Sequence, residues 1–127
     1  MTHLSPATAH ALKAAGFPQP APAIGQLWHL GEENLKIVLT QDLLESDRFI
    51  MPTLGSQFAA NYTLDEISQM SFCPTVEELL EVLPYGCNIY KVLNGFVVKH
   101  EFIEYSHFIL SEALAGLYLD IHETPAP

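Results

Sequence analysis

The fold of this chain depends most on residues 87–102, Cys87-Asn88-Ile89-Tyr90-Lys91-Val92-Leu93-Asn94-Gly95-Phe96-Val97-Val98-Lys99-His100-Glu101-Phe102. Two strand-like apolar runs flank Asn94-Gly95, a dipeptide typical of type I′ turns, in which both central residues need positive φ. The sequence therefore predicts a β-hairpin with Asn94 and Gly95 as its loop. Counting outward from the loop places Leu93 opposite Phe96, on the face that we expect to turn toward the core. The other predicted pairs on that face are Lys91 with Val98, Ile89 with His100, and Cys87 with Phe102.

Charge composition restricts the classes of partner. The 127 residues include 15 acidic and 5 basic side chains, for a net charge of −10. Affinity for nucleic acids and for anionic membranes depends on clustered Lys and Arg, so we expect neither partner. Mimicry of DNA by the acidic surface, as an inhibitor of DNA-binding proteins, is an alternative use of the same charge.

Cysteine usage and the N-terminus indicate an intracellular protein. Cys73 and Cys87 lie in apolar surroundings without other soft ligands, which predicts two buried reduced thiols, with a disulfide as the alternative. The first residues lack the basic and apolar runs of a secretory signal, and no apolar segment approaches the ~20 residues that span a bilayer. We therefore expect a cytoplasmic location.

Local signals divide one predicted compact domain, residues 1–127, into six segments. Ser5-Pro6 is typical of a helix start, and Pro18, Pro20 and Pro22 indicate an extended connector. The predicted segments are a capped helix over 1–16, a proline-rich strap over 17–25, strands over 26–53, a loop and central helix over 54–86, the hairpin over 87–102, and a C-terminal helix over 103–123.

Two capping boxes predict helix starts in the central segment. Thr63-x-x-Glu66 indicates a short helix, with a strand over 67–72 as the alternative, and Thr75-x-x-Glu78 precedes an apolar stripe. Together with two hairpins and one single strand, these elements predict an α+β fold. We expect one largely antiparallel sheet of about five strands with N-terminal, short central and C-terminal helices.

The last helix, expected from about Ser106 to His122, carries a second apolar face. Phe108, Ala115 and Leu119 align with Glu112 on a side that we expect to lie away from the core. Chance surface residues and a self-association patch both explain this face. The candidate interaction residues are therefore Phe108, Glu112 and Leu119, and a homodimer through this helix is one predicted assembly.

Few residues form a pattern that supports catalysis or metal binding. Glu104 and His107, with His100 nearby, have the spacing of a carboxylate and an imidazole on one helical face, but a metal-binding bundle needs two such pairs. Cys73 precedes the central helix, where a thiolate would be stabilised, yet apolar neighbours favour an inert thiol. We expect no catalytic residue, no cofactor and no metal, with Glu104 and His107 as the alternative metal ligands.

Three segments of the chain resemble a known group of proteins. They are Gly16-Phe17-Pro18-Gln19-Pro20, Gly25-Gln26-Leu27-Trp28, and Pro74-Thr75-Val76-Glu77-Glu78-Leu79-Leu80-Glu81-Val82-Leu83. They are similar to small uncharacterised proteins encoded in phage, prophage and related bacterial genomes. The resemblance covers the first thirty residues and the central helix, and it implies a genomic context without an activity.

These observations favour a non-catalytic interaction or accessory protein of phage or mobile-element context, with an unidentified protein partner. The alternative is a small ligand-binding or enzymatic domain that uses Cys73 or the neighbourhood of His100, Glu104 and His107. The two hypotheses differ in structure, because the second requires at least three of these groups to converge on a cleft.

Overall fold

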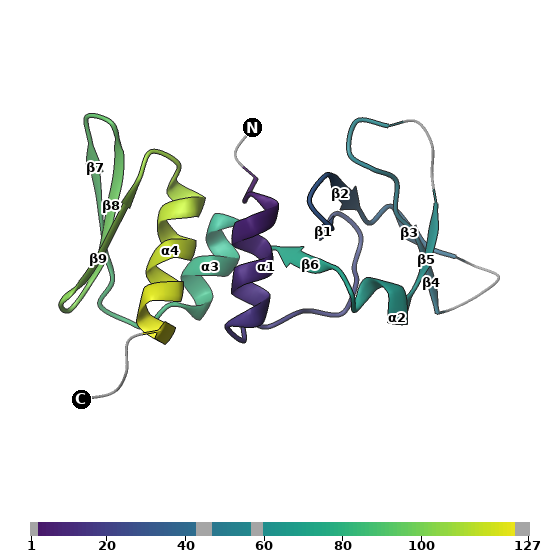
Figure 1. The fold of residues 1–127 in the computed structure, drawn as a ribbon, viewed down its shortest axis with the longest axis horizontal. Helices are drawn as coiled ribbons and strands as arrows, with labels where there is room; N and C mark the ends of the chain where they lie inside the picture. Colours follow the sequence, from purple (N-terminus) through teal and green to yellow (C-terminus); the bar gives the residue numbers. More distant parts are fainter. Residues whose placement is uncertain (1–2, 43–46, 57–59, 124–127) are drawn as a thin grey trace. The chain divides into compact units, whose positions relative to one another are not determined.

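The computed structural model describes residues 3–42, 47–56 and 60–123, which form four helices and nine strands. The strands make three antiparallel sheets of three strands each (Figure 1). The predicted α+β class is confirmed, and the predicted single sheet of about five strands is wrong. The chain divides into two compact units. Each unit contains its own sheets, which are built from short strands. Unit 1 comprises residues 1–17 and 74–127, and unit 2 comprises residues 18–73.

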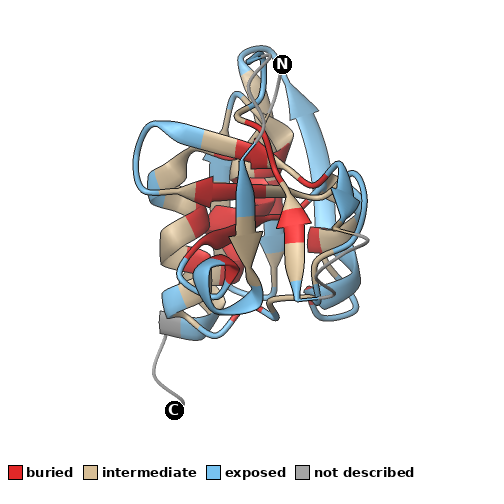
Figure 2. Ribbon diagram, turned by 90° about the vertical axis from the view of Figure 1, so that its right-hand side faces the viewer, coloured by how far each residue is buried: buried red, intermediate tan, exposed pale blue. Residues whose placement is uncertain are grey.

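Three helices build the core of unit 1. Helix α1 (Pro6–Ala14) begins at Ser5, whose hydroxyl accepts a hydrogen bond from the Thr8 backbone N–H at 3.2 Å. Helix α3 (Val76–Val82) begins with the predicted capping box of Thr75 and Glu78, which confirms the central helix. Helix α4 (Leu110–Glu123) packs against both. The fully buried side chains of these helices include Leu12, Leu79, Leu114 and Leu117, and buried residues are red in Figure 2.

A three-stranded sheet completes unit 1. Its strands β7 (Asn88–Val92), β8 (Gly95–His100) and β9 (Ile103–His107) lie in that order, and α4 packs against β8 and β9. Gly116 of α4 lies directly against the Tyr105 ring, where an added Cβ would overlap the ring. The helix predicted over 103–123 begins only at Leu110, because residues 103–107 form strand β9. Residues 103–107 alternate between half-buried and exposed side chains, which is the period of a strand.

The predicted hairpin is present, with a different register. Val92 pairs with Gly95, so Leu93 and Asn94 form the loop, and the predicted pairing is wrong by two residues. Gly95 has φ of 137°, whereas Asn94 is not among the described residues with positive φ. A Cβ on Gly95 would overlap the backbone of Phe108 at the end of β9, so this position is restricted to glycine. A shift of two residues leaves the side chains within β7 and β8 on their predicted faces, whereas Leu93 and Phe102 lie in loops.

Unit 2 contains the other two sheets. One has the order β2 (Asn34–Ile37), β1 (Leu27–Leu30), β6 (Ser71–Cys73), and the other has β3 (Thr40–Gln41), β4 (Arg48–Ile50), β5 (Asn61–Thr63). The predicted pairing of residues 26–30 with 35–41 is confirmed by β1 and β2, and Thr63 caps the short helix α2 (Leu64–Ile67). Trp28 is buried against Phe72, with ring centroids 5.3 Å apart. Gln19 of the proline-rich strap accepts a hydrogen bond from the Phe72 backbone N–H at 2.9 Å.

Candidate functional site

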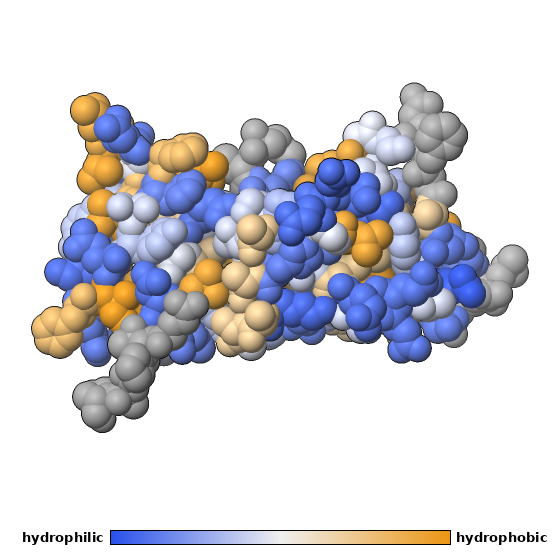
Figure 3. Space-filling model, viewed as in Figure 1, coloured by the Kyte–Doolittle hydropathy of each residue, from blue (hydrophilic) through white to orange (hydrophobic). Residues whose placement is uncertain are grey.

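The edge strand β7 of the unit 1 sheet and nearby loops expose a group of large apolar side chains, which we call the β7 surface. All five residues of β7 are exposed. Leu93 in the β7–β8 loop is 98% exposed, and Phe102 in the turn between β8 and β9 is 99% exposed. The β7 surface consists of Ile89, Tyr90, Val92, Leu93 and Phe102. Figure 3 shows hydrophobic side chains at the upper and lower ends of this sheet, with hydrophilic ones between them.

The sheet topology explains why β7 is exposed. One edge of β7 pairs with β8, and no strand in the described part of the chain pairs with its other edge. Helix α4 packs against the central strand β8 and the opposite edge strand β9, and it leaves β7 uncovered. Backbone N–H and C=O groups at such an edge are available to a strand from another chain.

Both faces of β7 carry apolar side chains. Ile89 is level with Val98, which is fully buried on the face turned to α4. Tyr90 and Val92 lie on the opposite face, where Tyr90 is level with Val97. Because neither face of β7 is buried, these side chains are free to contact a partner.

Charge near β7 differs from charge in the rest of the chain. Residues 82–100 contain no Asp or Glu, although the protein has 15 acidic residues. Lys91 lies on the face turned to α4, level with Phe96 of β8 and, beyond it, His107 of β9. Lys99 lies on the other face, directly opposite Glu104 of β9. Lys99 therefore has an acidic residue on the neighbouring strand, and Lys91 does not.

The predicted interaction residues of the last helix do not share one exposed surface. Phe108 is 69% exposed and stacks on His107, with ring centroids 4.7 Å apart. Glu112 instead contacts α1, because its carboxylate accepts hydrogen bonds from the Ser5 backbone N–H at 2.8 Å and the Thr8 hydroxyl at 2.7 Å. Leu119 is half-buried, and Ala115 on the same predicted face is fully buried. An interaction through Phe108 and Leu119 stays a prediction.

The histidine neighbourhood lies on strands. Glu104 and His107 are three residues apart in β9, so their side chains leave opposite faces of the sheet and cannot chelate as they would on a helix. His107 Nδ1 accepts a hydrogen bond from the Ile109 backbone N–H at 3.0 Å. Within the described residues, no three His, Cys, Asp or Glu side chains gather in a way that could hold a metal ion.

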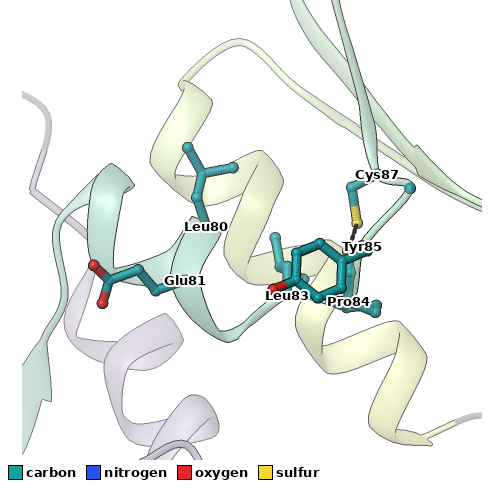
Figure 4. Close-up of a pocket in the computed structure, with 7 residues that line it drawn as sticks. Leu80, Glu81, Leu83, Pro84, Tyr85 and Cys87 are labelled. Atoms are coloured by element: carbon teal, nitrogen blue, oxygen red, sulfur yellow. Dashed lines mark hydrogen bonds between the residues drawn. The ribbon is translucent and has the colours of Figure 1, made fainter.

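Cys73 and Cys87 form no disulfide. Cys73 is buried in β6 of unit 2. Cys87 in unit 1 is half-exposed rather than buried, and its S–H donates a hydrogen bond to the Pro84 carbonyl at 3.1 Å (Figure 4). Burial raises the pKa of the Cys87 thiol, which disfavours the nucleophilic thiolate. The thiol lies at an open hollow of about 470 Å³ between the end of α3 and the start of β7, whose apolar lining includes Leu80, Leu83 and Tyr85.

Comparisons with known proteins add no assignment. No protein-family model matches the chain, and neither the curated proteins nor the solved structures gave a match. None of the helices that the structure describes has the length and apolar character needed to cross a membrane.

Proposed function

We propose that this protein is a non-catalytic interaction protein of phage or mobile-element context that binds a protein partner through the β7 surface. The observation that carries the proposal is the exposure of five large apolar side chains on and beside one edge strand. Several large apolar side chains exposed together on one sheet of a folded domain are typical of protein-binding sites. The phage context rests on the resemblance of residues 16–20, 25–28 and 74–83 to phage-type proteins.

Exposure on both faces of β7 supports a binding role over a role in folding. Residues that stabilise a sheet bury their apolar surface against neighbouring elements, as Val98 does under α4. Ile89, Tyr90 and Val92 keep 42%, 51% and 44% of their surface exposed and thus contribute little to the core of unit 1. A partner that covers them would gain the free energy of burying that surface.

Site-specific photo-crosslinking in a bacterial host that carries the gene tests the proposal. A photoreactive amino acid at Tyr90 should give a defined crosslinked product, and the substitution Val92→Lys should remove it. The matched control places the same amino acid at Ile24, an apolar residue of unit 2 that is 75% exposed. The same products from both positions, or none from Tyr90, would contradict a role of the β7 surface.

The homodimer through the last helix is tested separately by light scattering of the purified protein. A dimer that persists in the β7 variant Val92→Lys and dissociates in Phe108→Ser would support the helix as the interface. A monomer in both variants and in the wild type would leave the homodimer without support.

A further inference from the structure

We propose that β7 binds an extended acidic segment of the partner protein, which adds to the β7–β9 sheet as a fourth strand and places an Asp or Glu opposite Lys91. This inference rests on the proposed function and specifies the chemistry of the partner. It follows from two features of unit 1, the free edge of β7 and the distribution of charge around it.

The edge of β7 has the length that strand addition requires. Its five residues, at about 3.4 Å of rise each, extend over about 17 Å. An edge of this length pairs with a segment of about five residues, and the main-chain hydrogen bonds supply affinity without regard to the sequence of the segment. Specificity then depends on the side chains that alternate along β7.

The side chains of β7 define the pattern of the bound segment. Tyr90 and Val92 on one face favour apolar or aromatic partners directly opposite, because such cross-strand pairs each contribute about 0.2–1 kcal/mol. Lys91 on the other face lies between them in sequence and favours an opposite charge. The segment should therefore read apolar, acidic, apolar at three consecutive positions.

The positive charge of Lys91 favours an acidic segment, because the β7 edge has no acidic side chain of its own to neutralise it. Residues 82–100 carry Lys91 and Lys99 without any Asp or Glu, in a chain of net charge −10. The acidic Glu104 is level with Asn88 and Lys99, so it lies three residues along the strand and two strands across from Lys91, about 14 Å away. That distance exceeds the Debye length of about 8 Å at physiological ionic strength, so Glu104 leaves the attraction of Lys91 for an approaching carboxylate largely unscreened.

A second copy of the chain fits this edge less well. If two β7 strands pair about a two-fold axis at Tyr90, Ile89 of each copy lies opposite Lys91 of the other, and the two lysines become diagonal neighbours at about 7–8 Å. Like charges of the two lysines then face each other across the new interface, which an acidic segment opposite Lys91 avoids. We therefore expect the occupant of β7 to be a different chain.

The test uses the full-length protein and a panel of labelled six-residue peptides. In each peptide the third residue is Glu in one set and Lys in the other, and it is flanked on both sides by Val, Ile or Tyr. Fluorescence anisotropy should show that the Glu set binds about fivefold more tightly than the Lys set, the factor that corresponds to a cross-strand pair of about 1 kcal/mol. Amide hydrogen exchange should slow in β7 when a Glu peptide binds.

Charge reversal identifies Lys91 as the discriminating residue. The variant Lys91→Glu should prefer the Lys peptides, whereas the matched control Lys99→Glu, on the other face and beside Glu104, should keep the wild-type preference. Both lysines are exposed strand residues, and circular dichroism checks that each variant is folded.

Three outcomes would overturn the inference. They are failure of all peptides to bind the wild-type protein, equal binding of both peptide sets, and a wild-type dimer that Val92→Lys dissociates. A specific crosslink from Tyr90 together with failure of all peptides would retain the proposed function and reject strand addition. Peptide binding that slows exchange in β7 without any crosslink in cells would reject the proposed cellular role and support the chemistry of the edge.

Discussion

At the scale of single residues, contact with one aromatic ring explains why glycine occupies position 116. The helix α4 would gain about 1 kcal/mol from alanine at this position, but the added Cβ overlaps the Tyr105 ring, and overpacking costs about 1–3 kcal/mol. We expect Gly116→Ala to lower the free energy of unfolding by about 1 kcal/mol in urea titrations. In the background of Tyr105→Ala, the same substitution should raise it by about 1 kcal/mol. Equal effects in both backgrounds would show that the ring moves aside.

Glu112 provides a second prediction at this scale, because its carboxylate joins α4 to the first turn of α1. It accepts two hydrogen bonds, from the Ser5 N–H and the Thr8 hydroxyl, in a partly buried position. Removing a charged acceptor of this kind costs about 1–3 kcal/mol, so Glu112→Ala should lower the free energy of unfolding by that amount. Glu104→Ala, at an exposed position of β9, is the control and should change it by less than about 0.5 kcal/mol. A neutral Glu112→Ala would assign this residue to the surface, as its position in the sequence suggested.

Much of the candidate site could have been predicted from the residues of the hairpin. Residue alternation places Ile89, Lys91 and Val98 on the same face in both the predicted and the observed register. The prediction that this whole face is buried holds for Val98 and fails for β7. Lys91 was the available signal, because a lysine is rarely fully buried without a charged partner. The exposure of Phe102 was not predictable, because it depends on Ile103 starting another strand.

At the scale of elements, the cap of α2 makes the stability of this helix depend on pH. A hydrogen bond from the Thr63 backbone N–H, and then one with the Thr63 hydroxyl, lower the pKa of Glu66 below its ordinary value. Because the folded chain binds this proton more weakly than the unfolded chain, Glu66 stabilises the fold above the ordinary glutamate pKa of about 4.3. That contribution is lost as the pH falls through the lowered pKa of the folded state.

An NMR titration of the Glu66 carboxyl carbon measures this effect. We expect its midpoint below the ordinary glutamate value in the native protein and closer to that value in Thr63→Ala, which lacks the hydroxyl. The variant Glu66→Gln should remove the contribution of this group to the acid-side pH dependence. A native midpoint at the ordinary value would contradict the capping interaction.

Local elements were predictable, and elements that depend on distant contacts were not. The starts of α1, α2 and α3 followed from Ser5, Thr63 and Thr75, because a cap involves only residues within one turn. The hairpin loop was misplaced because Asn94-Gly95 favours type I′ geometry, whereas Gly95 is held against the backbone at the end of β9. Strand β9 was missed because residues 103–107 directly precede the strong helical stripe of α4, and the pattern of that helix was extended over them.

At the scale of the whole molecule, the structure separates the buried residues of the chain into two units. Leu114 of α4 is buried in unit 1, and Ile67 of α2 and Trp28 of β1 are buried in unit 2. The sequence predicted a single domain and a single sheet from length and strand count. Neither length nor strand count reveals which strands pair, because pairing between distant strands depends on tertiary contacts.

Whether the two units unfold together is measurable because the protein contains one tryptophan. Trp28 reports on unit 2 by fluorescence, and far-UV circular dichroism reports mainly on the helices of unit 1. Leu114 is fully buried and Ile67 is 2% exposed, so each change to alanine should cost about 2–5 kcal/mol. We expect Leu114→Ala to shift the circular dichroism transition to lower urea with little change in the Trp28 transition, and Ile67→Ala to do the reverse. The predicted single domain requires instead that both probes shift together in both variants, since a cooperative two-state unit has one transition.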